Sequence, residues 1–154
     1  MITSEKNEDE ILFILQNLRA EDKIEAETVI GKDYIEKTLK RIFEPDIVFF
    51  LAKDNNNIPY AMGGYQTTEE KGVVLIWLLS TNDIAHHRHF VLRKIREELK
   101  KIEQNNWFIF NYIFEKNYLA KIWLKKFGFS FISDKSFSKG FELFYKKREL
   151  KGLE

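Results

Sequence analysis

All three histidines of this 154-residue chain, His86, His87 and His89, lie within four positions of the segment NDIAHHRHF (82–90). Imidazoles this close could bind a metal ion, but zinc needs three or four converging ligands and the chain has no cysteine to supply one. With Arg88 they could instead donate to a phosphate group, because a helix N-terminus behind them favours an anion. The simplest alternative is an exposed turn whose polar side chains only cap that helix.

Other polar residues also stand in positions where chemistry is conceivable. Asn111 interrupts an otherwise apolar strand pattern, and a buried amide needs partners, so it either ties neighbouring backbone together or faces a cleft. Arg93, Arg96 and Lys100 follow helical spacing on one face, which could attract an adenosine 3′-phosphate or a nucleic acid. A solvated face paired with nearby glutamates explains the same three cations equally well.

Composition restricts the class of protein. With 25 basic and 24 acidic residues the net charge is +1, which argues against a protein that coats nucleic acid or an anionic membrane. The longest apolar run, VVLIWLL (73–79), is too short to span a bilayer, and the acidic start lacks the apolar core of a signal peptide. With 44% hydrophobic residues and no cysteine, we expect one globular domain over 1–154 in a reducing cytoplasm.

The hydrophobic period predicts a mixed α/β sheet. Helical spacing covers 7–18, 20–30, 32–43, 87–104 and 118–127. Strand patterns cover 47–53, 58–66, 73–80, 107–114, 129–133 and 141–147. A helix joins two apolar strands between 73 and 114, and such a crossover connects parallel neighbours. We therefore expect 73–80 and 107–114 to be adjacent and parallel.

The segment NYLAKIWLKKFGF (117–129) resembles the last motif of the GNAT acyltransferase superfamily, where an Asn opens a helix and a Gly-Phe pair follows after ten intervening residues. Asn117, Ala120, Gly128 and Phe129 match that pattern. The order of the other segments is similar to the short GNAT-like proteins of tailed phages. These segments are LRAEDKIE (18–25), AMGG (61–64), IWLLST (76–81), Asn111, KIWL (121–124) and FELF (141–144). The resemblance implies a GNAT-like mixed central sheet with helices on both faces and a splayed parallel strand pair at its centre.

The resemblance also implies a site for acetyl-coenzyme A or coenzyme A. In this superfamily the pantetheine arm pairs with exposed strand backbone, and the pyrophosphate lies on the N-terminus of the following helix. The segment 82–90 is then a phosphate turn, and no bound metal is expected. The residues implied to contact the coenzyme are Leu79, Ser80, Thr81, His86, His87, Arg88, His89, Phe90 and Asn117.

Two features depart from the superfamily pattern. The usual turn carries glycines that let backbone approach phosphate, whereas no glycine lies between Gly72 and Gly128 here. The position that often holds a catalytic Tyr is Leu124. The candidates that remain for catalysis are Asn111, Asn117 and Tyr118.

Two functions from different classes are therefore open. The first is a GNAT-like acyltransferase that moves an acetyl or acyl group from acyl-coenzyme A to an amine of a small molecule or protein. The second is a non-catalytic GNAT-shaped phage protein, either a virion component or a binder of a host factor, with a degenerate coenzyme turn. Host cytoplasm or a virion is the expected location for a phage-encoded chain. A homodimer fits either function, and neither a membrane nor a nucleic acid is expected as a partner.

Overall fold

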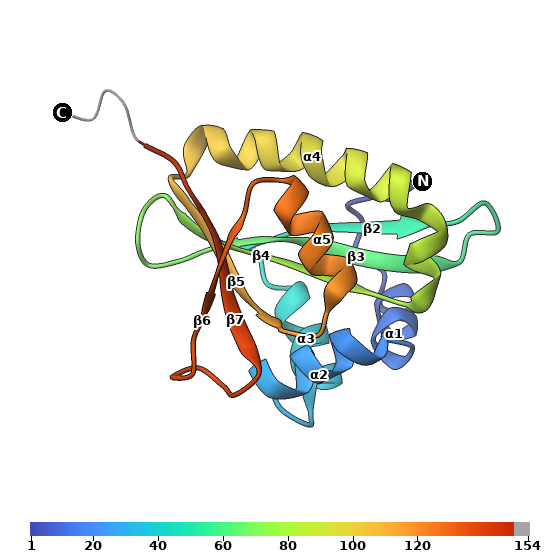
Figure 1. Cartoon of the computed structure of the whole chain (residues 1–154). Coiled ribbons are helices and arrows are strands. Elements are labelled where there is room, and N and C mark those ends of the chain that lie inside the picture. Colours follow the sequence, from blue (N-terminus) through green and yellow to red (C-terminus); the bar gives the residue numbers. More distant parts are fainter. Residues whose placement is uncertain (150–154) are drawn as a thin grey trace. The chain divides into compact units, whose positions relative to one another are not determined.

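The computed structural model describes residues 1–149 (Figure 1). Its strands form a seven-stranded mixed sheet in the order β1-β2-β3-β4-β5-β7-β6, which confirms the predicted mixed α/β class. The chain forms two compact units, one made of 1–66 and 77–87 and the other of 67–76 and the residues from 88 onward. The expectation of one domain over 1–154 stays a prediction, and 150–154 lie outside the described part. Among the described residues, no helix has the length and apolarity needed to cross a bilayer.

The first unit contains three short helices, and its hydrophobic core joins two of them to its own strands. Its core brings Ile11, Ile14 and Leu15, all fully buried, against strand residues that include Leu51 and Met62. Its elements are β1 (Ile2–Thr3), α1 (Glu8–Gln16), α2 (Ala20–Val29), α3 (Tyr34–Ile42), β2 (Ile47–Lys53), β3 (Pro59–Thr67), the end of β4 (Val73–Ser80) and the 3₁₀ helix η1 (Asn82–His87). The apolar period of α1 thus places one face of that helix on the core, as its spacing predicts.

The β2–β3 hairpin depends on a capped turn and on one glycine. The Asp54 side chain closes its turn by accepting from the backbone N–H groups of Asn56 and Ile58, at 2.8 and 2.9 Å. Opposite Phe49, a Cβ on Gly64 would lie 1.8 Å from the carbonyl oxygen of Val48. Only glycine therefore lets the two strands approach this closely.

The second unit carries the predicted parallel pair. Val73–Leu75 of β4 pair in parallel with Phe108–Phe110 of β5, so the expected adjacency and direction are confirmed. Strand β7 pairs antiparallel with both β5 and β6. The elements of this unit are the start of β4, α4 (Arg88–Asn105), β5 (Phe108–Phe114), α5 (Tyr118–Lys126), β6 (Ser130–Ser133) and β7 (Phe141–Lys147). Helices α4 and α5 lie next to each other in Figure 1.

Glycine ends α5 where the sequence predicts. Gly128 has φ +89°, a conformation that favours glycine, and its N–H donates to Lys125 O while Phe129 N–H donates to Leu124 O. This pair of bonds satisfies carbonyls that the helix end would otherwise leave unpaired. Val91, Leu99 and Ile102 form the buried face of α4, whereas Leu92 is half-buried.

Candidate functional site

The segment between β4 and α4 folds as a 3₁₀ turn rather than as an open loop. Ile84, buried at 1% exposure, anchors it, and its N–H donates to Thr81 O at 3.2 Å. The Asp83 N–H donates to the Thr81 hydroxyl at 3.3 Å. Helix α4 begins immediately afterwards at Arg88, so that His86 and His87 precede the helix N-terminus in sequence and His89 lies in its first turn.

The three histidines do not act as one group. His86 and His89 are exposed, whereas His87 stacks on Tyr60 with ring centroids 4.1 Å apart and planes at 16°. The Nε2 atom of His87 also lies 3.3 Å from Asp83 Oδ2. Burial raises the pKa of Tyr60, and the charge of Asp83 acts in the same direction, so the phenol is neutral. The stack of His87 on Tyr60 holds the turn against β3.

No group of three or more His, Cys, Asp or Glu residues within 1–149 is placed to hold a metal ion. The expectation that the protein binds no metal stays a prediction. Because His87 is committed to Tyr60 and Asp83, a metal held by all three imidazoles would first have to break that stack. The described geometry thus offers the histidine cluster no ready metal site.

A buried carboxylate that sequence reasoning overlooked holds the end of β4. Asp22, at the start of α2 and 3% exposed, accepts from Ser80 N–H at 2.9 Å and from Ser80 Oγ at 3.0 Å. Its other oxygen lies 3.3 Å from Arg19 Nη1, and Arg19 N–H donates to Ser80 O at 2.9 Å. Burial raises the pKa of Asp22 although Arg19 and the Ser80 hydrogen bonds oppose that shift. We call Arg19, Asp22 and Ser80 the β4 clasp.

Arg19 and Asp22 lie in LRAEDKIE (18–25) and Ser80 lies in IWLLST (76–81), two of the segments on which the GNAT-like resemblance rests. Hydrogen bonds within the protein also limit which backbone groups of the predicted coenzyme residues remain for a ligand. The N–H and C=O groups of Ser80 bond the clasp, and those of Thr81 bond Tyr60 O and Ile84 N. A carbonyl oxygen keeps a second lone pair for a ligand, whereas an N–H group does not. Leu79 is half-buried and packs on the core of the first unit.

In the second unit, Asn111 ties neighbouring backbone together, which is the first of its two predicted roles. Its Nδ2 donates to Ile76 O at 2.7 Å, and its Oδ1 accepts from Tyr112 N at 2.7 Å. Both Nδ2 and Oδ1 of the Asn111 amide are therefore hydrogen-bonded to backbone groups. Its assignment as a catalytic candidate stays a prediction.

Asn117 is the side-chain cap of α5. Its Oδ1 accepts from Ala120 N at 3.4 Å, and the residue is 1% exposed. Tyr118, the next residue, is 66% exposed, and Leu124 is half-buried on the same helix. Arg88 and Phe90, at the start of α4, are exposed and half-buried respectively. Whether any of them contacts a coenzyme stays a prediction.

No protein-family model matches the chain, and neither does any curated protein sequence. Solved structures match it along almost its whole length. The ribosomal-protein-S18-alanine N-acetyltransferase from Escherichia coli has a TM-score of 0.67 at 13% identity, covering 100% of this chain and 98% of that one. The PaiA N-acetyltransferase from Thermoplasma acidophilum, in complex with coenzyme A, has a TM-score of 0.65 at 15% identity over 96% and 98%.

A third match is the GNAT domain of PAT from S. lividans, with a TM-score of 0.69 at 13% identity over 96% of this chain and 89% of that one. Structural likenesses at sequence identities this low establish the fold but not the activity. The observed strand order, the parallel β4–β5 pair and these likenesses agree with one another. The chain therefore has the fold of the GNAT N-acetyltransferases.

Proposed function

We propose that the protein transfers an acyl group from acyl-coenzyme A to an amine acceptor. The observation that carries this proposal is the likeness, over the whole chain, to several N-acetyltransferases, one of them in complex with coenzyme A. Fold alone does not determine function, so the proposal also depends on the turn between β4 and α4. That turn leads directly into a helix N-terminus, which is suited to an anion.

The turn would bind the pyrophosphate of the coenzyme through side chains as well as backbone. His86 in η1 is exposed, as are Arg88 and His89 in the first turn of α4, and the Arg88 guanidinium can form paired hydrogen bonds to phosphate oxygens. His87 would act indirectly, by fixing the turn to Tyr60. The pantetheine N–H groups would donate to the carbonyl oxygens of Leu79, Ser80 and Thr81. Those of Ser80 and Thr81 can accept a second hydrogen bond without losing the first.

In the proposed reaction the amine nitrogen attacks the thioester carbonyl carbon, so that a C–N bond forms and the C–S bond breaks. The nitrogen loses one proton and the sulfur takes up one, so that coenzyme A leaves as a thiol. Of the three catalytic candidates, Asn111 and Asn117 use their side chains within the fold. Tyr118 is exposed, and its hydroxyl forms no hydrogen bond within residues 1–149. We therefore propose Tyr118 as the donor that protonates the leaving sulfur.

The binding step is tested by calorimetry with acetyl-coenzyme A and coenzyme A. Arg88→Ala is expected to weaken binding by about 1.5–3 kcal/mol, the value of a hydrogen bond to a charged group. Lys101→Ala is the matched control, since Lys101 is exposed and pairs with Glu98 on α4. The proposal is wrong if the wild type binds neither ligand at millimolar concentration.

A non-catalytic function is the second candidate, and the site itself supports it. The turn has no glycine, Leu124 stands where the superfamily often has a Tyr, and the N–H groups of Ser80 and Thr81 already have protein partners. A phage protein of this kind would serve as a virion component or bind a host factor. Binding of acetyl-coenzyme A without acylation of any amine in a panel of polyamines, amino acids and peptides would favour this function. A cytoplasmic location and a homodimer remain part of the first proposal.

A further inference from the structure

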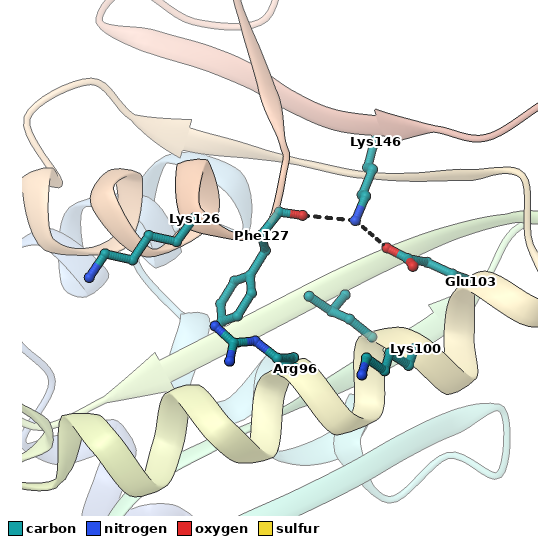
Figure 2. A pocket seen from close by; sticks show the side chains of 7 residues that line it. Arg96, Lys100, Glu103, Lys126, Phe127 and Lys146 are labelled. Atoms are coloured by element: carbon teal, nitrogen blue, oxygen red, sulfur yellow. Dashed lines mark hydrogen bonds and ion pairs between the residues drawn. The ribbon is translucent and has the colours of Figure 1, made fainter.

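A pocket of the second unit is lined by more cations than carboxylates. The cavity, about 200 Å³ in volume, opens among the C-terminal half of α4, the end of α5 and β7 (Figure 2). Four of its lining residues are cationic and one is acidic. The lining residues are Arg96, Leu99, Lys100, Glu103, Lys126, Phe127 and Lys146.

One of these cations has a structural role. The Lys146 ammonium lies 2.5 Å from Glu103 Oε1 and donates to Phe127 O at 2.8 Å, as Figure 2 shows. It thereby neutralises the single carboxylate of the pocket and satisfies a carbonyl at the end of α5. A Cβ on Gly128 would lie 3.4 Å from Lys146 Cε, so the lysine packs closely over the helix end.

The other three cations keep their charge unmatched. Within residues 1–149, no ion pair joins Arg96, Lys100 or Lys126 to a carboxylate. The Arg96 guanidinium carbon lies 5.8 Å from the centre of the Phe127 ring, a contact that orients the side chain without neutralising it. By contrast, Lys94 and Lys101 of the same helix both pair with Glu98, at 3.4 and 3.3 Å.

The helix dipoles explain only part of this arrangement. Lys126 lies in the last turn of α5, where a cation is favourable. Arg96 and Lys100 lie four residues apart and before the last turn of α4, so they gain little from its dipole. Like charges at this spacing destabilise a helix. A bound anion would reverse that effect.

We propose that this pocket binds the phosphoryl group of a small phosphate-bearing molecule. A phosphoryl group carries up to two charges and several acceptor oxygens, which suits one arginine fork and two lysine ammonium groups better than a single carboxylate would. Leu99 and Phe127, both less than a tenth exposed, add apolar surface to the pocket, and the exposed side chains of Arg96, Lys100 and Lys126 leave their charged ends accessible to a ligand from solvent. The pocket contains none of the residues proposed to bind the coenzyme, so this inference is independent of acyl transfer.

The test is an NMR titration of the ¹⁵N-labelled protein at low ionic strength with inorganic pyrophosphate, followed by ADP. The amide signals of 96–103 and 126–128 are expected to shift and saturate. In Arg96→Gln/Lys100→Gln, pyrophosphate affinity read from these signals should fall about tenfold or more, and its melting temperature should not fall. In the matched control Lys94→Gln/Lys101→Gln, which removes two charges from the same helix, affinity should stay within about twofold.

Several results would overturn the proposal. One is the absence of saturable shifts at the pocket amides. Another is an equal loss in the two double variants, which would indicate attraction to net charge only. A third is a parallel loss of coenzyme A affinity in Arg96→Gln/Lys100→Gln, since the pocket would then belong to the coenzyme site. If ADP binds more tightly than pyrophosphate, the ligand of the pocket is a nucleotide. If the two bind with equal affinity, the ligand is free pyrophosphate. Both results support the site.

Discussion

Replacing Asp22 should measure how strongly the β4 clasp stabilises the protein. Asp22→Ala removes the acceptor of two Ser80 hydrogen bonds and one of the partners of Arg19, which also pairs with Glu21 at 3.5 Å. Each buried polar group left without a partner costs about 1–3 kcal/mol. The Ser80 hydroxyl can rotate to another acceptor, so we expect a total loss near 2–4 kcal/mol. Asp22→Asn keeps one acceptor oxygen and should lose about 1 kcal/mol.

The assay is urea unfolding followed by tryptophan fluorescence. Asp33→Asn is the control, because Asp33 is an exposed acid whose pair with Lys37 is more than half exposed on both sides. That change should cost less than about 0.5 kcal/mol. The reasoning is refuted if Asp22→Ala is no more destabilising than Asp33→Asn.

The same carboxyl predicts a pH dependence with a defined sign. Because the pKa of Asp22 is raised in the folded state, the folded protein binds the Asp22 proton more tightly than the unfolded chain does. Its contribution to stability is complete below the unfolded value of about 3.9 and is lost as pH rises through the folded value. The free energy of unfolding of the wild type minus that of Asp22→Asn should therefore decrease from pH 4 to pH 7. A difference that stays constant or increases would contradict the raised pKa.

Other changes test the fold and the site. Asn117→Ala should destabilise the protein by about 1 kcal/mol in urea through loss of the α5 cap, and Asn117→Asp should restore most of it. Gly128→Ala should cost about 1–2 kcal/mol because φ is +89° there, again measured by urea unfolding. Gly64→Ala should cost more than about 3 kcal/mol or prevent folding, since its Cβ would lie 1.8 Å from Val48 O; soluble yield and circular dichroism report it. Elemental analysis of untagged protein should find less than one zinc per chain, and a stoichiometric metal would contradict the phosphate-turn interpretation.

Local pattern predicted the elements well where apolar runs are bounded by clear breaks. β4 occupies 73–80 as expected, since Gly72 precedes its apolar run and a polar turn follows it. β1 was not predicted, because Ile2 and Thr3 form a strand only by pairing with Ala52 and Leu51 of β2. Two residues in an acidic segment carry no period of their own.

The candidate site was less predictable because long-range contacts decide what each side chain does. Nothing local distinguishes His87 from His86, yet Tyr60 on β3 fastens one of them and leaves the other exposed. In the sequence, Asp22 looks like an ordinary acidic residue at a helix start. Its role in holding the end of β4 follows only from its contact with Ser80, 58 residues away. Propensity and spacing carry no information on such pairs.

Asn111 has a consequence for how the parallel strands find their alignment. Backbone pairing of β4 with β5 reaches Leu75 and Phe110, and the next position is joined by the Asn111 amide to Ile76 O. A slip of one residue would turn the amide to the opposite face of the sheet and leave that carbonyl facing an apolar side chain of β5. The Asn111 amide thus penalises a one-residue shift of β5 against β4.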